Sequence, residues 1–119
     1  MRRALLLMPA LVLLAGCTPT PDVTITDADN GGHVEINVGD VVDILLADDY
    51  EKSKTQWRED GSFDWDILKP LGSKYQPAPG TYTDRLQGVG PGTVHLTLVQ
   101  SDNGDRVSRR FAVDITVRS

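Results

Sequence analysis

The chain has 119 residues, of which 39% are hydrophobic and 24% charged, and its formal net charge is −5 at pH 7. This length suffices for one domain with a buried core. The acidic balance makes nucleic acid a poor partner, because the phosphate backbone repels a negative protein, and one cysteine excludes a disulfide framework. We interpret the acidity as a solubility feature that leaves neutral or basic proteins open as partners.

The N-terminus predicts export and lipid anchoring. Two arginines follow Met1, residues 4–14 are apolar but too few to span a bilayer, and Leu-Ala-Gly-Cys17 resembles the lipobox of bacterial lipoproteins. In such proteins the signal, here residues 1–16, is removed and the cysteine carries a thioether-linked diacylglycerol that holds the chain on a membrane. The alternative is an ordinary thiol after an ordinary signal peptide or membrane anchor. We expect a lipid on Cys17 and a location at the cell membrane or outer membrane of a bacterium.

Residues 17–32 have the composition of a lipid anchor and tether. Their Thr-Pro pairs are followed by the short run Val23–Thr26, which can pair as an edge strand, and then by a polar stretch. Residues 27–31 superficially resemble a calcium loop, but they lack the downstream glutamate that such loops need, so we predict a turn there. The folded domain is then expected over residues 33–119.

Beyond the tether, alternating apolar and polar residues predict strands. Two strands joined by a tight turn are expected first, and a hairpin around Asn103-Gly104 is expected in the C-terminal third, because Asn-Gly is a strong hairpin signal. The apolar positions are Val34, Ile36 and Val38, then Val42, Ile44 and Leu46, then Val94, Leu96 and Leu98, and finally Phe111, Val113, Ile115 and Val117. A charge at Leu96 or Val113 is expected to unfold the domain.

The middle of the chain is less regular. It contains three further short strand candidates, Gln56–Arg58, Asp64–Leu68 and Tyr82–Gln87, separated by turns rich in Gly and Pro, and it shows no helical apolar stripe. Short strands with a turn every ten or so residues are typical of an immunoglobulin-like β-sandwich. We therefore predict an all-β fold of about seven strands.

Three aromatic residues are candidates for either core or contact. Trp57 is expected in the core of the sandwich. For Trp65 the core is favoured over an exposed platform for sugar, although acidic neighbours on both sides keep the second interpretation open. Tyr50 lies in a charged loop, where a tyrosine is suited to act as a rigid contact residue.

Catalytic and metal-binding patterns are lacking. His33 and His95 have no second ligand at metal spacing, so we expect both to be surface residues. Residues 88–92 are glycine-rich but lack the strand-to-helix context of a phosphate loop. Two acidic loops could in principle form a paired-carboxylate or calcium site, but neither contains a recognisable motif for one. They contain Asp48, Asp49 and Glu51 in one loop, and Asp60, Asp64 and Asp66 in the other. We expect no enzyme, cofactor or metal, and binding through loops instead.

Motifs along residues 34–118 resemble, in order, the chagasin-type inhibitors of papain-like cysteine peptidases. The matching motifs are Val38-Gly39-Asp40, Ile44-x-Leu46, Trp57, Leu71-Gly72-Ser73-Lys74-Tyr75-Gln76-Pro77, Gly90-Pro91-Gly92-Thr93-Val94-x-Leu96-x-Leu98 and Phe111–Val117. The resemblance implies a sandwich that wedges three loops into a peptidase cleft.

The three loops depart from the family's inhibitory motifs. Residues 48–54 are charged where the family has Asn-Pro-Thr-Thr-Gly, residues 77–81 replace a Gly-rich turn, and residues 101–106 lack the family's Arg-Pro and aromatic anchor. The candidate partner-binding residues are Asp48, Asp49, Tyr50, Lys52, Lys54, Pro77, Pro79, Gly80, Asp102, Asn103 and Arg106. These departures favour a non-inhibitory envelope module that binds a protein or a glycan, and inhibition of papain-like peptidases is the alternative.

Overall fold

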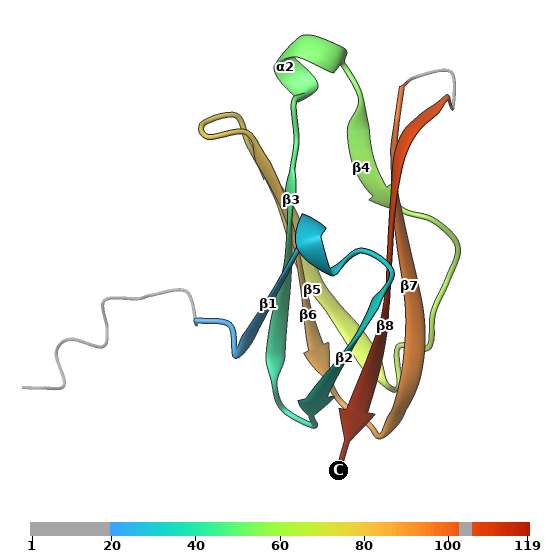
Figure 1. The fold of residues 1–119 in the computed structure, drawn as a ribbon. Coiled ribbons are helices and arrows are strands. Elements are labelled where there is room, and N and C mark those ends of the chain that lie inside the picture. The colour runs from blue at the N-terminus through green and yellow to red at the C-terminus, as the bar shows by residue number, and fades with distance from the viewer. Residues whose placement is uncertain (1–19, 103–105) are drawn as a thin grey trace, which may run out of the picture.

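The computed structural model describes residues 20–102 and 106–119, and it is a β-sandwich of two four-stranded sheets (Figure 1). One sheet has the strand order β1-β3-β6-β5, and the other has the order β2-β8-β7-β4. The strands are β1 (Val23–Thr26), β2 (Gly32–Asn37), β3 (Val41–Ala47), β4 (Gln56–Glu59), β5 (Leu68–Gln76), β6 (Thr81–Gly88), β7 (Gly92–Ser101) and β8 (Val107–Arg118). The predicted all-β, immunoglobulin-like sandwich is thereby confirmed.

Helical structure in the described residues is limited to the 3-10 turn η2 (Asp27–Asp29) and one α-helical turn, α2 (Tyr50–Ser53). No helix within residues 20–102 and 106–119 has the length and apolar character needed to cross a membrane. Cys17, the predicted lipid-attachment residue, lies outside the described residues.

The hairpin of β7 and β8 matches its prediction residue by residue. Val94 pairs with Ile115, Leu96 with Val113 and Leu98 with Phe111, and all six side chains are buried. Their neighbours on the opposite face, His95, Thr97, Ala112, Asp114 and Thr116, are exposed or half-buried, as alternation requires, but Val99 on that face is buried at 1% exposure. The Asn103-Gly104 pair itself lies outside the described residues.

The tight turn after β2 carries the chain from one sheet to the other. β2 pairs in parallel with β8, while β3 pairs with β1 and β6 in the opposite sheet. The Asn37 N–H donates to Asp40 Oδ2 at 2.8 Å, which closes this turn. Val38 lies in the turn rather than in β2 and is 44% exposed, so the prediction that it shares the buried face with Ile36 was wrong.

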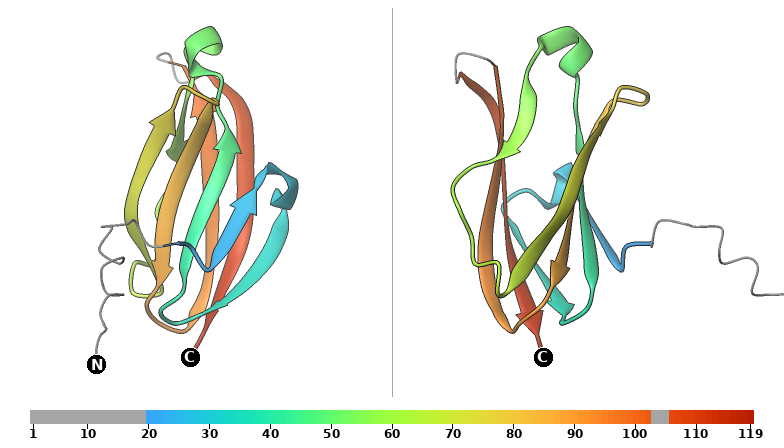
Figure 2. Two further views of the ribbon diagram at one scale, coloured as in Figure 1. Left: turned by 90° about the vertical axis from the view of Figure 1, so that its left-hand side faces the viewer. Right: turned by 180° about the vertical axis from the view of Figure 1, so that it is seen from behind.

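The N-terminal part of the sandwich begins before residue 33. Val23–Thr26 forms the predicted edge strand β1, parallel to β3, and the predicted turn at residues 27–31 contains η2. Figure 2 shows this segment against the sandwich. Residues 23–32, assigned to the tether from sequence, therefore belong to the folded domain.

The prediction of a strand over Asp64–Leu68 was wrong. Asp64 Oδ1 accepts the Asp66 N–H at 2.8 Å, and the Asp64 carbonyl accepts the N–H groups of Ile67 and Leu68 at 3.1 Å each, which makes a turn. Trp65 projects from this turn and is 64% exposed, so its assignment to the core was also wrong. The strand that follows, β5, begins at Leu68 and has a register shift between Pro70 and Gly72.

The core fills the space between the two sheets. It contains the predicted inward residues of β3, β7 and β8, together with Ile25, Leu68 and Leu86. Trp57 of β4 is 6% exposed and belongs to this core, which confirms its prediction. The carboxyl group of Asp84 is also buried on the inner face, with 2% exposure.

Candidate functional site

The strand pairing brings the three predicted loops to one end of the sandwich. In the first sheet Ala47, Thr81 and Gln76 lie side by side, so the loop after β3 is adjacent to the turn between β5 and β6. In the second sheet Gln56 pairs with Ser101, so the same loop returns beside the end of β7. Figures 1 and 2 show α2 and the 77–80 turn at this end, which we call the loop end.

The first loop, residues 48–55, is folded on itself. Asp48 Oδ1 accepts the Tyr50 N–H at 3.0 Å, and the Ser53 hydroxyl donates to Asp49 Oδ1 at 3.1 Å. Lys54 ends α2 in the left-handed conformation, with φ of 60°, and its Nζ lies 5.5 Å from the centre of the Tyr50 ring. The loop is thus a compact turn rather than an extended segment.

The first loop is attached to the second, residues 77–80. The Asp48 N–H donates to the Gly80 carbonyl at 3.0 Å, and the Gly80 N–H donates to the Gln76 carbonyl at 3.0 Å. The Tyr50 and Tyr75 rings meet edge to face with centroids 5.7 Å apart, which is a favourable aromatic geometry. Pro79, a predicted contact residue, follows a cis peptide bond in this exposed turn, and Pro77 is also exposed.

Arg109 and Gln100 fasten the first loop to the β7–β8 hairpin. Gln100 is buried, its Nε2 donates to Asp49 Oδ1 at 3.2 Å, and its Oε1 accepts Arg109 Nε at 2.8 Å. Arg109 Nη2 also donates to the Ala47 carbonyl at 2.8 Å, and its guanidinium lies 5.1 Å from the Trp57 ring centroid. Neither residue was among the candidates predicted from the sequence. The only sequence feature that could have indicated them is the predicted hairpin, in which they are paired.

The third loop is closed at its base. Asp102 Oδ1 accepts the Arg106 N–H at 2.9 Å, and the Asp102 N–H donates to the Arg106 carbonyl at 3.1 Å. Asn103, another predicted contact residue, lies outside the described residues. A hollow of about 480 Å³ separates the first and third loops and is lined by Tyr50, Lys54 and Asp102 among others.

The exposed surface of the loop end carries both signs of charge. Glu51, Lys52, Lys54 and Arg106 are exposed. The Ser53 hydroxyl holds the pKa of Asp49 below its ordinary value, whereas burial raises the pKa of Asp48. The loop end therefore presents fixed charges suited to electrostatic recognition of a partner.

The other polar candidates serve local structure. His33 is bonded to Thr116 and His95 to Asp114, and both histidines are exposed, as predicted. Asp60 pairs with Arg110 at 3.1 Å. Within residues 20–102 and 106–119 no three metal-binding side chains gather.

Comparison with known proteins identifies the scaffold. No protein-family model matches the chain, and no curated protein matches it either. Among solved structures, the cysteine protease inhibitor EhICP2 from Entamoeba histolytica has a TM-score of 0.67 at 16% identity, covering 83% of this chain and 100% of that one. The solution structure of Amebosin has a TM-score of 0.60 at 18% identity, with the same coverages.

A third match is PbICP-C in its complex with falcipain-2, with a TM-score of 0.57 at 12% identity, covering 85% of this chain and 93% of PbICP-C. Identities this low show a shared fold. Because these structures include chagasin-type inhibitors, the scaffold predicted from the ordered motifs is confirmed. The chain has the β-sandwich fold of the chagasin-type cysteine protease inhibitors.

Proposed function

We propose that the protein inhibits papain-like cysteine peptidases by inserting its loop end into the peptidase cleft. The observation that carries this proposal is that three loops distant in sequence lie at one end of the sandwich. Hydrogen bonds connect the first loop to the second loop and to Gln100 of β7. The names of two structural neighbours, an inhibitor and a complex with falcipain-2, support it. In this interpretation the protein acts by blocking access and not by catalysis.

The mode of contact follows from the loop chemistry. A loop that is already folded loses little conformational entropy on binding, which favours affinity. The third loop lacks an aromatic anchor, so Tyr50, held against Tyr75, is the rigid aromatic group best placed to act as one. The exposed charges of the first loop would then select a peptidase whose cleft rim carries complementary charges.

A titration against papain tests the proposal. The purified protein is expected to lower hydrolysis of a small fluorogenic substrate competitively, and Lys52→Glu is expected to change the inhibition constant by about tenfold. Lys69→Glu is the matched control, because Lys69 is an exposed residue of β5 toward the opposite end of the sandwich. No inhibition by about 10 µM protein across several papain-like peptidases would overturn the proposal.

That negative result would favour the second candidate, a non-inhibitory envelope module that binds a protein or a glycan. The observation on its side is that the first loop contains no Pro or Gly and the third loop contains no aromatic residue, unlike the inhibitory motifs. A pull-down of envelope proteins and a glycan array, each compared with the Lys52→Glu variant, would then identify the partner.

We further propose that Cys17 carries a lipid and places the domain on the outside of a bacterial membrane. The lipobox-like sequence supports this location, and a peptidase outside the cell would be the target. Expression in a bacterium with labelled palmitate is expected to label the protein and to leave it in the membrane fraction. Cys17→Ala should remove both the label and the membrane association, and labelling that persists in this variant would contradict the proposal.

A further inference from the structure

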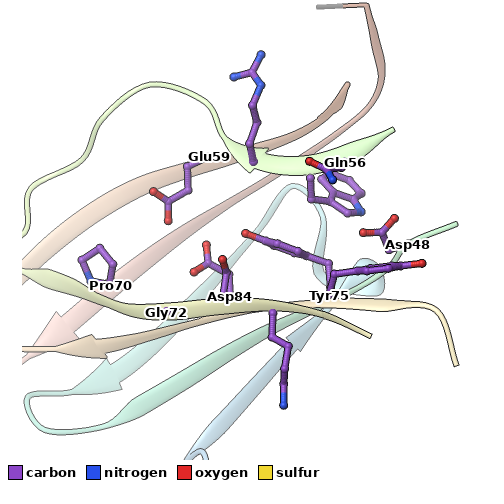
Figure 3. A pocket seen from close by; sticks show the side chains of 12 residues that line it. Asp48, Gln56, Glu59, Pro70, Gly72, Tyr75 and Asp84 are labelled. Atoms are coloured by element: carbon purple, nitrogen blue, oxygen red, sulfur yellow. The ribbon is translucent and has the colours of Figure 1, made fainter. Parts of the chain in front are cut away.

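A cleft of about 520 Å³ opens between the two sheets on the side where β4 and β5 are the edge strands (Figure 3). Residues that alternate inward from three strands line it: Trp57 and Glu59 from β4, Ser73 and Tyr75 from β5, and Tyr82 and Asp84 from β6. The cleft adjoins the loop end, with which it shares Gln56, Trp57 and Arg58, but Asp84 and Glu59 lie outside the three loops.

Asp84 is the unusual member of this lining. It pairs with Ile44 on one side and Ser73 on the other, so its side chain projects from the inner face, where it is 2% exposed. Its Oδ2 accepts no hydrogen bond from the described residues. A buried polar atom left without a partner costs about 1–3 kcal/mol, and more when it is charged. This oxygen is therefore a buried acceptor that a ligand entering the cleft can use.

The second carboxyl group of the cleft belongs to Glu59. Figure 3 shows Glu59 and Asp84 directed toward one another across the gap between β4 and β6. Burial first, and then a side-chain hydrogen bond with Glu59 and the charge of Glu59, raises the pKa of Asp84 to about 8. The same environment, through burial first and Asp84 second, raises the pKa of Tyr82 to about 12. A positive charge placed between the two carboxyl groups would stabilise the state in which both are ionised.

No basic side chain of the described residues faces this pair from the cleft walls. Arg58 and Lys74 line the rim, but alternation directs both to the outer faces of their sheets. Arg58 Nε donates to Ser101 Oγ at 3.3 Å, and Lys74 pairs with Thr83, beside rather than opposite Asp84. The ionisable groups that face Asp84 are thus Glu59, Tyr75, Tyr82 and, at the end of the cleft, Asp48. All of them are acids.

The lining favours an organic cation over a metal ion. A calcium ion takes six to eight oxygen ligands, and no three metal-binding side chains gather in the described residues. Aromatic faces, in contrast, attract ammonium groups, and Tyr75, Tyr82 and Trp57 line the cleft. We propose that the cleft binds a primary alkylammonium group, held by Asp84 and Glu59 against the tyrosine rings. Its source is either a free alkylamine or the lysine side chain of a partner peptide.

Binding of this group is coupled to a proton. Near neutral pH the Asp84 carboxyl holds a proton, and the arriving ammonium displaces that proton to solvent while keeping its own charge. The affinity is therefore expected to rise with pH up to about 8, by at most tenfold per pH unit. A binding site with no linked carboxyl group would show no such rise in this range.

Backbone amide chemical shifts of the purified protein provide the test, with two probes titrated at pH 8: n-butylamine and the amidated peptide Gly-Ser-Lys-Ser-Gly. We expect saturable shifts at β4, β5 and β6, and none with the peptide that carries norleucine in place of lysine. Asp84→Asn and Glu59→Gln should each weaken binding at least tenfold. Their matched controls are Asp114→Asn and Glu35→Gln, exposed or half-exposed carboxylates on the outer face of the β2-β8-β7-β4 sheet.

The outcomes distinguish the two sources of the ammonium group and show whether the site exists. Tighter binding of the peptide assigns the site to a partner's lysine, and equal binding assigns it to a free amine. Absence of saturable shifts, equal binding to the Asp84→Asn variant, or binding of Ca²⁺ alone overturns the proposal. Because Asp84 and Glu59 lie outside the three loops, neither variant should change peptidase inhibition. Failure here is thus distinguishable from failure of the proposed function.

Discussion

The carbonyl of Gly80 accepts the backbone N–H of Asp48 at 3.0 Å, so the second loop is hydrogen-bonded directly to the first. Gly80 has φ of +93°, and a Cβ atom built on it would lie 3.0 Å from the Asp48 carbonyl oxygen. A side chain at this position is therefore disfavoured both by the backbone conformation and by the neighbouring loop. The spacing of the two loops depends on this glycine.

Gly80→Ala is expected to destabilise the protein by about 1–2 kcal/mol from the backbone conformation, plus the cost of displacing the first loop. Urea unfolding measures the total. Gly61→Ala is the matched control, since Gly61 has φ of +85° but no atom within 4 Å of the added Cβ. Only Gly80→Ala should also weaken peptidase inhibition. Equal losses of stability in both variants, with unchanged inhibition, would show that contact between the loops is unimportant.

Trp57→Phe is expected to cost about 1 kcal/mol, because it removes the Nε1 hydrogen bond to the Ala47 carbonyl while Arg109 still donates to the same oxygen. Trp57→Ala should cost about 3–5 kcal/mol through the cavity it leaves. Trp65→Phe, at a residue 64% exposed, should stay within about 0.5 kcal/mol of the unsubstituted protein. Urea unfolding followed by circular dichroism measures all three.

The parts of the fold that sequence predicted are those encoded locally. Strict alternation in β7 and β8 specifies both the strands and their buried face. β5 was missed because its register shift at Pro70 and Gly72 breaks the alternation. The turn at Asp64 was predicted as a strand. This turn is made by hydrogen bonds such as that from the Asp66 N–H to the Asp64 side chain, and such bonds produce no periodic pattern of apolar residues in the sequence.

The candidate site was predictable in part. Because the motifs resemble a known scaffold, they indicated which loops would share one end of the sandwich. The contacts made by Gln100 and Arg109 beneath those loops were not predictable, since they join residues far apart in sequence. The burial of Asp84 was not predicted for a similar reason. An acidic residue in a strand is expected to be exposed, and only the pairing with the neighbouring strands shows that it points inward.

Stability should fall as pH rises from about 4 to about 8. The pKa of Asp84 is raised to about 8 in the folded protein, so the folded state binds more protons than the unfolded state in this window. The contribution of Asp84 to the free energy of unfolding therefore decreases with rising pH, by at most about 1.4 kcal/mol per pH unit. Urea unfolding at several pH values between 5 and 8, without added amine, measures the slope.

Asp84→Asn should flatten this dependence and make the protein more stable than the unsubstituted form at pH 8, since an amide of the same shape carries no charge to bury. Asp114→Asn, at a half-exposed position, should leave the slope in place. If the slope persists in Asp84→Asn, a different group is responsible for it.

Arg109→Lys is expected to loosen the first loop. Arg109 makes two hydrogen bonds through different nitrogens, to Gln100 and to the Ala47 carbonyl, and also covers the Trp57 ring. An ammonium group is a compact point charge and cannot reproduce that planar arrangement. We expect a loss of about 1–2 kcal/mol and faster amide hydrogen exchange at residues 50–54.

Arg110→Lys provides the matched control for that substitution. Arg110 is the next residue of β8, projects from the opposite face and makes an exposed ion pair with Asp60 at 3.1 Å. Surface pairs of this kind contribute about 0–1 kcal/mol, so exchange in the first loop should not change. If exchange at residues 50–54 is unchanged in Arg109→Lys as well, the loop is held by its own turn, through Asp48 and Ser53, and the contact with β8 adds nothing to its rigidity.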